Sequence, residues 1–160
     1  MKLLPYLLTA CLVTLALPAT ALEPVTPPEA PIVVYKVESG FSETKEFLEM
    51  AITDRGMSVS DTLHISDMLE RTAKDTGLDR KLYGKAESLE FCSIAMSYKM
   101  SEAHPANLSV CPLTIGVYTL PDNADYTYIT YQRPVLLGDG AAAAKALTEL
   151  LDGIIREAVE

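Results

Sequence analysis

Two cysteines, Cys92 and Cys111, are the residues of this 160-residue chain whose type and spacing most directly suggest chemistry. The third cysteine, Cys11, lies in an apolar N-terminal stretch that we expect to be removed on export. Only one intramolecular pairing then exists, and an oxidising compartment favours its formation. We therefore predict a Cys92–Cys111 disulfide, which in the chain-entropy model stabilises the fold by about 3 kcal/mol. A redox-active pair is the alternative, although the Cys-x-x-Cys spacing that depresses thiol pKa values is absent.

Soft metal ligands recur at intervals of four residues, at Cys92, Met96, Met100 and His104. Thiolate and thioether sulfur prefer Cu(I), so neighbouring members of this stripe, joined by Cys111 or His64, form a candidate copper site. All four cannot bind one ion, because on a helix they span about 18 Å. The alternative is that both methionines pack in the core, a common use of methionine at helical spacing. We predict no other cofactor.

Histidine, carboxylate and tyrosine side chains form weaker candidates for a functional site. A solvated role is the default for His64, which lies on the polar side of a predicted strand, and Asp61, Glu87 and Glu90 have no defined pairing. Four tyrosines cluster on a predicted hairpin, where they favour cross-strand packing, a ligand groove or a dimer face: Tyr118, Tyr126, Tyr128 and Tyr131. The sequence contains no phosphate-binding glycine loop, serine elbow or His-Glu-x-x-His motif. We therefore assign no catalytic residue.

The N-terminal stretch, residues 1–21, is typical of a cleaved secretory signal peptide. Lys2 precedes an apolar run over residues 3–17, which is shorter than the roughly 20 residues needed to span a bilayer. Ala19-Thr20-Ala21 then matches the small-residue pattern that signal peptidase accepts. Leu8-Thr9-Ala10-Cys11 has the form of a lipobox, but the apolar run continues beyond it. We expect export to the periplasm and a mature chain that begins at Leu22.

Charge narrows the choice of partners. The chain has 13 Lys and Arg against 22 Asp and Glu, a net charge of −9. Removal of Lys2 leaves 12 against 22, a net charge of −10. An acidic surface repels phosphate backbones, so nucleic acid is not an expected partner. No second apolar stretch is long enough to cross a membrane, so we expect a soluble protein with no membrane association after signal cleavage.

Residues 22–31 are proline-rich, and residues 32–160 alternate strand and helix patterns. Proline lacks the N–H donor of regular structure, so the first segment is expected to be a poorly ordered linker. Strands are predicted over 32–37, 57–65, 86–91, 113–120 and 126–131. In the second of these, Met57, Val59, Leu63 and Ile65 alternate toward one side. Helices are predicted near 42–55, 66–74 and 93–103 and at the C-terminus, where an apolar face recurs at helical spacing: Leu147, Leu150, Leu151, Ile154, Ile155 and Ala158. The expected fold class is α+β, a single two-layer domain with a mainly antiparallel sheet of about five strands and helices on one face.

Several short motifs occur in a recognisable order along this domain. They are Gly40-Phe41, Glu90-Phe91-Cys92-Ser93, the run from Cys111-Pro112 to Tyr118, and Tyr131-Gln132-Arg133-Pro134 ahead of the terminal helix. In this order the chain resembles the bacterial family called domain of unknown function 302, over roughly residues 32–160. The resemblance implies a compact α+β fold and homodimers, and it implies no activity.

Three classes of function follow from these residues. We favour an exported, non-catalytic binding or accessory domain of unknown ligand, because no catalytic constellation stands out. The alternatives are a periplasmic Cu(I)-binding protein and a thiol–disulfide redox protein, both of which would use Cys92 and Cys111.

Overall fold

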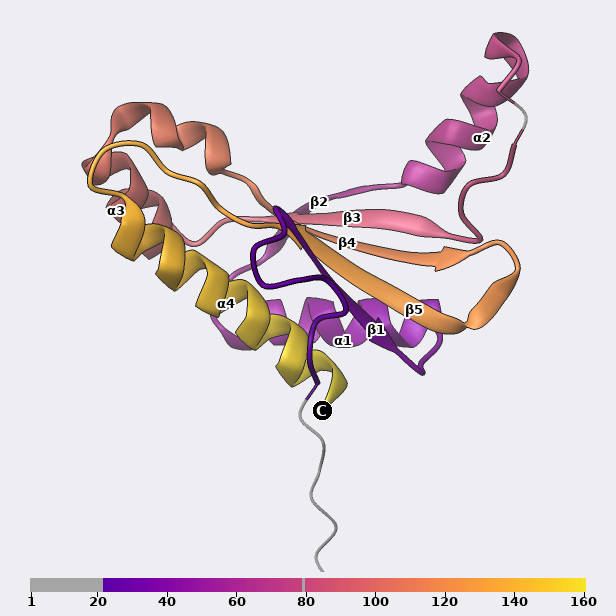
Figure 1. Ribbon diagram of the computed structural model, residues 1–160, viewed down its shortest axis with the longest axis horizontal. Coiled ribbons are helices and arrows are strands. Elements are labelled where there is room, and N and C mark those ends of the chain that lie inside the picture. The colour runs from indigo at the N-terminus through magenta and orange to yellow at the C-terminus, as the bar shows by residue number, and fades with distance from the viewer. Residues whose placement is uncertain (1–21, 79) are drawn as a thin grey trace, which may run out of the picture.

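The computed structural model describes residues 22–78 and 80–160, so the predicted signal peptide lies outside the described residues (Figure 1). Within these described residues, five strands, four α-helices and one 3-10 helix follow one another. They are β1 (Ile32–Val37), α1 (Phe41–Asp54), β2 (Val59–Leu63), α2 (Ile65–Thr76), β3 (Ala86–Phe91), α3 (Ile94–Ala103), η1 (Pro105–Val110), β4 (Leu113–Leu120), β5 (Asn123–Gln132) and α4 (Ala141–Val159).

The strands form one open sheet in the order β1-β5-β4-β3-β2, and every neighbouring pair is antiparallel. The predicted hairpin is present as β4 and β5, although β5 begins at Asn123, three residues earlier than expected. Helices α1 and α4 pack against each other and against the sheet (Figure 1). The predicted α+β class and antiparallel sheet of about five strands are therefore confirmed.

The core lies between the sheet and helices α1 and α4. Alternate strand residues point into it, because successive side chains of a strand face opposite ways. The largest fully buried side chains come from the sheet, from α1 and α4, and from α3: Tyr35, Leu48, Ile52, Leu89, Phe91, Met100, Ile115, Ile129, Leu147, Leu151, Ile154 and Ile155. Burial of each such side chain contributes about 1.5–3 kcal/mol relative to exposure, and this apolar contact holds the helices on the sheet.

Two buried tyrosines tie α4 to the sheet through one carboxylate. The hydroxyls of Tyr35 on β1 and Tyr131 on β5 both donate to Oδ1 of Asp152, over 2.8 and 2.5 Å. Burial, together with the negative Asp152, raises the pKa of both tyrosines above the ordinary value. Both hydroxyls therefore keep their protons near neutral pH, and they satisfy a carboxylate that α4 places against the sheet.

Strand β2 differs from its predicted pattern because it contains a bulge. The pairing register with β3 shifts between Val59, which faces Phe91, and Asp61, which faces Glu90. An extra residue moves every following side chain to the other face of the sheet. Leu63 is consequently exposed, and Ile65 is the first residue of α2 rather than part of a longer strand.

The proline-rich segment 22–31 contains no helix or strand, but it lies against the domain rather than forming a poorly ordered linker. The Val25 amide donates to the Val34 carbonyl over 2.7 Å, and the Val34 amide donates to Thr26 Oγ1 over 3.1 Å. Strand β1 is an edge of the sheet, and edge strands leave unpaired backbone groups that a covering segment can satisfy. Within the described part of the chain, no helix has the length and apolarity that crossing a membrane requires.

Candidate functional site

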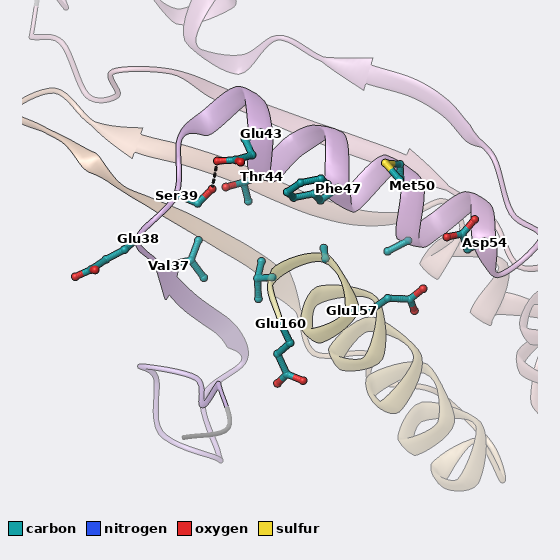
Figure 2. A pocket seen from close by; sticks show the side chains of 13 residues that line it. Val37, Glu38, Ser39, Glu43, Thr44, Phe47, Met50, Asp54, Glu157 and Glu160 are labelled. Carbon is teal, nitrogen blue, oxygen red and sulfur yellow. Dashed lines mark hydrogen bonds between the residues drawn. The ribbon is translucent and has the colours of Figure 1, made fainter. Parts of the chain in front are cut away.

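An open groove of about 550 Å³ lies between α1 and the last turns of α4 (Figure 2). On α1, a single stripe at helical spacing runs through Glu43, Phe47, Met50 and Asp54 and faces this groove (Figure 2). Phe47 and Met50 are 43% and 53% exposed, although apolar side chains of their size are usually buried in a helix that packs on a core. The α1 helix therefore has a second apolar surface, outside the one that it packs on the sheet.

The charged residues of the groove are all acidic. They come from the end of β1, from α1 and from the end of α4: Glu38, Glu43, Asp54, Glu157 and Glu160. Among the described residues that line it there is no Lys, Arg or His. Ser39 donates to Glu43 over 2.9 Å and Tyr126 donates to Glu38 over 3.0 Å. From outside the groove, Arg55 pairs with Glu157 and Arg156 pairs with Glu160. The groove thus combines an apolar floor with a negative rim, which attracts cations and accepts hydrogen bonds.

Cys92 and Cys111, the predicted disulfide pair, are brought to disulfide distance. Cys92 directly follows β3 and Cys111 precedes β4, and since these strands are antiparallel neighbours their adjoining ends meet. The two Cα atoms are 6.3 Å apart, inside the range that a bridge requires. Ser97 Oγ lies 3.7 Å from the Cys111 sulfur. This arrangement fits the predicted Cys92–Cys111 disulfide.

Three of the remaining candidate metal ligands, Met96, Met100 and His104, take packing or capping positions. Met100 is buried in the core and Met96 packs partly against it, as the packing alternative expects. His104 ends α3, and its Nδ1 accepts the Ala106 amide over 3.1 Å at the start of η1. Across residues 22–78 and 80–160, no three His, Cys, Asp or Glu side chains are grouped to hold a metal ion. Copper binding stays a prediction without a formed site.

A charged cluster that was not predicted joins three elements at the base of α2. Glu87 on β3 lies 2.6 Å from Lys45 Nζ on α1 and 3.1 Å from Nδ1 of His64, the residue that precedes α2. Burial alone would raise the pKa of Glu87, but the hydrogen bonds from Lys45 and His64 outweigh it and lower that pKa. The same hydrogen bond raises the pKa of Lys45. The cluster is therefore an ion pair with an added histidine, and sequence spacing could not reveal it because its members lie 19 or more residues apart.

The other two carboxylates that the sequence singled out face each other. Asp61 on β2 is the direct cross-strand partner of Glu90 on β3. Like charges in this position destabilise a sheet slightly, so the pair does not help to hold β2 against β3.

The four hairpin tyrosines separate onto the two faces of the sheet. Tyr118 and Tyr128 stack across β4 and β5 with ring centroids 5.0 Å apart, and Tyr83 meets Tyr118 edge-on at 5.5 Å. Lys36 covers the ring of Tyr126 at 3.6 Å. Tyr131 instead points into the core toward Asp152. Cross-strand packing is therefore confirmed for Tyr118 and Tyr128.

The groove was missed at the sequence level, although one signal for it exists. The predicted helix over 42–55 had an apolar face of Phe47, Leu48, Ala51 and Ile52, but the structure buries only the last three of these and leaves Phe47 exposed. Met50 falls outside that face, and Phe47 and Met50 stand between two acids at helical spacing. An apolar pair between acids on the outer side of a helix indicates a second contact surface.

Comparison with known proteins agrees with this fold. The family model described as "Domain of unknown function DUF302" matches residues 33–158. A solved structure, the uncharacterized conserved protein DUF302 from Bacillus stearothermophilus, is similar with a TM-score of 0.65 and 20% identity, over 79% of this chain and 97% of that one. No curated protein matches the chain. The chain belongs to the DUF302 family.

Proposed function

We propose that this protein is a non-catalytic binding domain whose groove between α1 and α4 takes a cationic amphiphile. The ligand class is a primary amine with a short apolar tail. One observation carries the proposal: Phe47 and Met50 are exposed in a groove whose charged lining residues are all acidic.

The two halves of such a ligand match the two parts of the groove. An apolar tail would cover Phe47 and Met50, and covering a side chain of this size contributes about 1.5–3 kcal/mol. An ammonium head would lie beside the carboxylate of Asp54, at the end of this stripe next to Met50, where a charge-assisted hydrogen bond contributes about 1.5–3 kcal/mol. The volume of about 550 Å³ falls within the roughly 300–1,000 Å³ of small-molecule sites.

Export, periplasmic location and homodimer formation belong to the same proposal. Export is supported by the Ala19-Thr20-Ala21 pattern behind an apolar run. The cysteine pair at disulfide distance suits an oxidising compartment. A homodimer is supported by the family resemblance, since the family's members are expected to pair.

Calorimetric titration with three probes tests the binding proposal. Decylammonium carries both features, decanoate carries the tail with the opposite charge, and spermidine carries cations without a tail. We expect binding of decylammonium, below its micelle concentration, and at least roughly tenfold weaker binding of the other two. Equal binding of decanoate would contradict the role of the acidic rim.

Variants of the floor and the rim locate the site. Met50→Ala and Asp54→Asn should each weaken decylammonium binding by roughly tenfold, which corresponds to about 1.4 kcal/mol. Met68→Ala and Glu149→Gln make the same kinds of change at exposed positions outside the groove. These controls should leave binding unchanged; a parallel loss in the controls would refute binding in the groove.

A further inference from the structure

Helix α2 and its flanking residues form an arm at one end of the sheet. We use "arm" for residues 63–78 and 80–82. Figure 1 shows α2 standing apart from the other helices. None of the arm side chains whose burial the structure describes is buried, and five large apolar side chains are exposed on it: Leu63, Met68, Leu69, Leu78 and Leu82. Concentrated exposed apolar surface of this kind marks an interaction site.

The arm has few attachments to the rest of the domain. Ser66 Oγ donates to the Ala86 carbonyl over 3.4 Å, and His64 pairs with Glu87. Gly77 ends α2 in the left-handed conformation at φ 70°, and Lys81 pairs with Glu70 over 3.1 Å. A helix of 12 residues is marginally stable in water without tertiary packing. A partner that covers α2 would therefore stabilise it more than it would stabilise any other helix of the fold.

The charge of the arm fits a second copy of this chain. The chain as a whole carries −9, so most contacts between two copies bring like charges together. Over the arm the sequence instead sets three acids against four bases: Asp67, Glu70 and Asp75 against Arg71, Lys74, Arg80 and Lys81. Copies can meet at the arm without the repulsion that they meet elsewhere.

The order of charges along α2 also favours an antiparallel match with itself. The first half of the helix carries Asp67 and Glu70, and the second half carries Arg71 and Lys74 alongside Asp75. Two antiparallel copies bring the acidic half of each helix to the more basic half of the other. A twofold contact is self-complementary in this way, and it places Met68 and Leu69 near the axis because they lie near the middle of the helix.

We propose that the arm is the contact between two copies, with the two α2 helices antiparallel across a twofold axis. This inference rests on the proposed homodimer and adds the surface that forms it. The exposed leucines at either end of the arm extend the contact beyond the helix pair. The groove between α1 and α4 lies outside this contact and stays open to its ligand.

Sedimentation velocity of the purified protein at micromolar concentration tests the arm. The arm variant combines Met68→Glu with Leu69→Glu, and the matched control combines Phe47→Glu with Met50→Glu in the groove. We expect the unmodified protein and the control to be dimers, and the arm variant to have a dimer Kd raised by roughly 100-fold, since each change near the centre of an interface costs about tenfold or more. Circular dichroism should show the fold retained in both variants, because the four positions are exposed.

Each other outcome has a separate meaning. A monomeric unmodified protein would overturn both the homodimer and the arm contact. A dimeric arm variant would overturn the arm contact alone, and a control that dissociates while the arm variant does not would move the contact to the groove. A monomer that floats with phosphatidylglycerol vesicles would assign the arm to a membrane surface and overturn the proposal. Failure of decylammonium to bind the groove affects none of these results.

Discussion

Strand β3 has a short helical excursion at each end, and the two excursions are attached to the domain in opposite ways. The excursion after β3, formed by α3 and η1, is fastened by a cysteine pair, by the buried Met100 and by the buried Asn107. Asn107 donates to the Met100 and Leu137 carbonyls and accepts the Leu137 amide, over 2.8–3.1 Å. The excursion before β3 is the arm, in which every side chain whose burial is described is at least partly exposed.

The comparison shows that two similar helices, each next to β3, have different roles. Both helices carry methionine at spacings that suit an apolar face, yet Met100 is 1% exposed and Met68 is 46% exposed. Burial and the cysteine pair at disulfide distance make the α3 side part of the stable domain. The arm leaves its apolar surface uncovered, which costs stability in the isolated chain and provides a contact surface.

The largest expected difference between the two excursions comes from Met100→Ala against Met68→Ala. Removing the fully buried methionine leaves a cavity, so unfolding free energy should fall by about 2–5 kcal/mol. The same change in the arm should alter it by less than about 0.5 kcal/mol. Urea denaturation of a dilute, monomeric sample measures both values. Equal changes in unfolding free energy would show that the segments before and after β3 do not differ in how firmly they are attached to the domain.

Loss of the cysteine bridge should have the next largest effect, on the α3 side only. Cys92 and Cys111 are separated by 19 residues, and in the chain-entropy model a loop of this size stabilises by about 3 kcal/mol. The double variant Cys92→Ser, Cys111→Ser should unfold at lower urea and lose its sensitivity to reductant. Near-stoichiometric free thiol in protein from the periplasm, counted under denaturing conditions, would refute the bridge and strengthen the copper and redox alternatives.

The smallest effect is expected at the base of the arm, from Glu87→Gln. Its folded pKa lies below the unfolded value of 4.5, so its stabilisation is fully present above that value and is lost as pH falls through the folded pKa. We expect a cost of about 1 kcal/mol near pH 7, which disappears as the solution is acidified below the folded pKa. Urea midpoints of the unmodified protein and the variant across this pH range measure it.

A surface pair provides the control for that experiment. Glu149→Gln removes the exposed pair with Lys145, which should contribute less than about 0.5 kcal/mol. A Glu87→Gln cost that does not change with pH would exclude the ion pair as its source.

Much of the fold follows from local sequence patterns. The apolar face of α4 was predicted with its buried Leu147, Leu151, Ile154 and Ile155, because a 19-residue helix repeats its period many times. The β4–β5 hairpin followed from two β-rich runs around a turn. Cys92 and Cys111 were paired by elimination, because removal of the predicted signal peptide would leave only these two cysteines. Patterns of this kind depend on residues that are close in sequence or few in number.

Contacts between distant segments were decided by the tertiary structure. The bulge in β2 shifts the register against β3 and turns Leu63 outward, which alternation alone predicted as buried. Glu87, Lys45 and His64 meet because three elements converge. The groove exists because α4 ends beside α1 and leaves Phe47 and Met50 uncovered. Sequence determines what each segment tends to form and which side chains are apolar or charged, whereas only packing decides which faces are covered, since coverage depends on elements that are far apart along the chain.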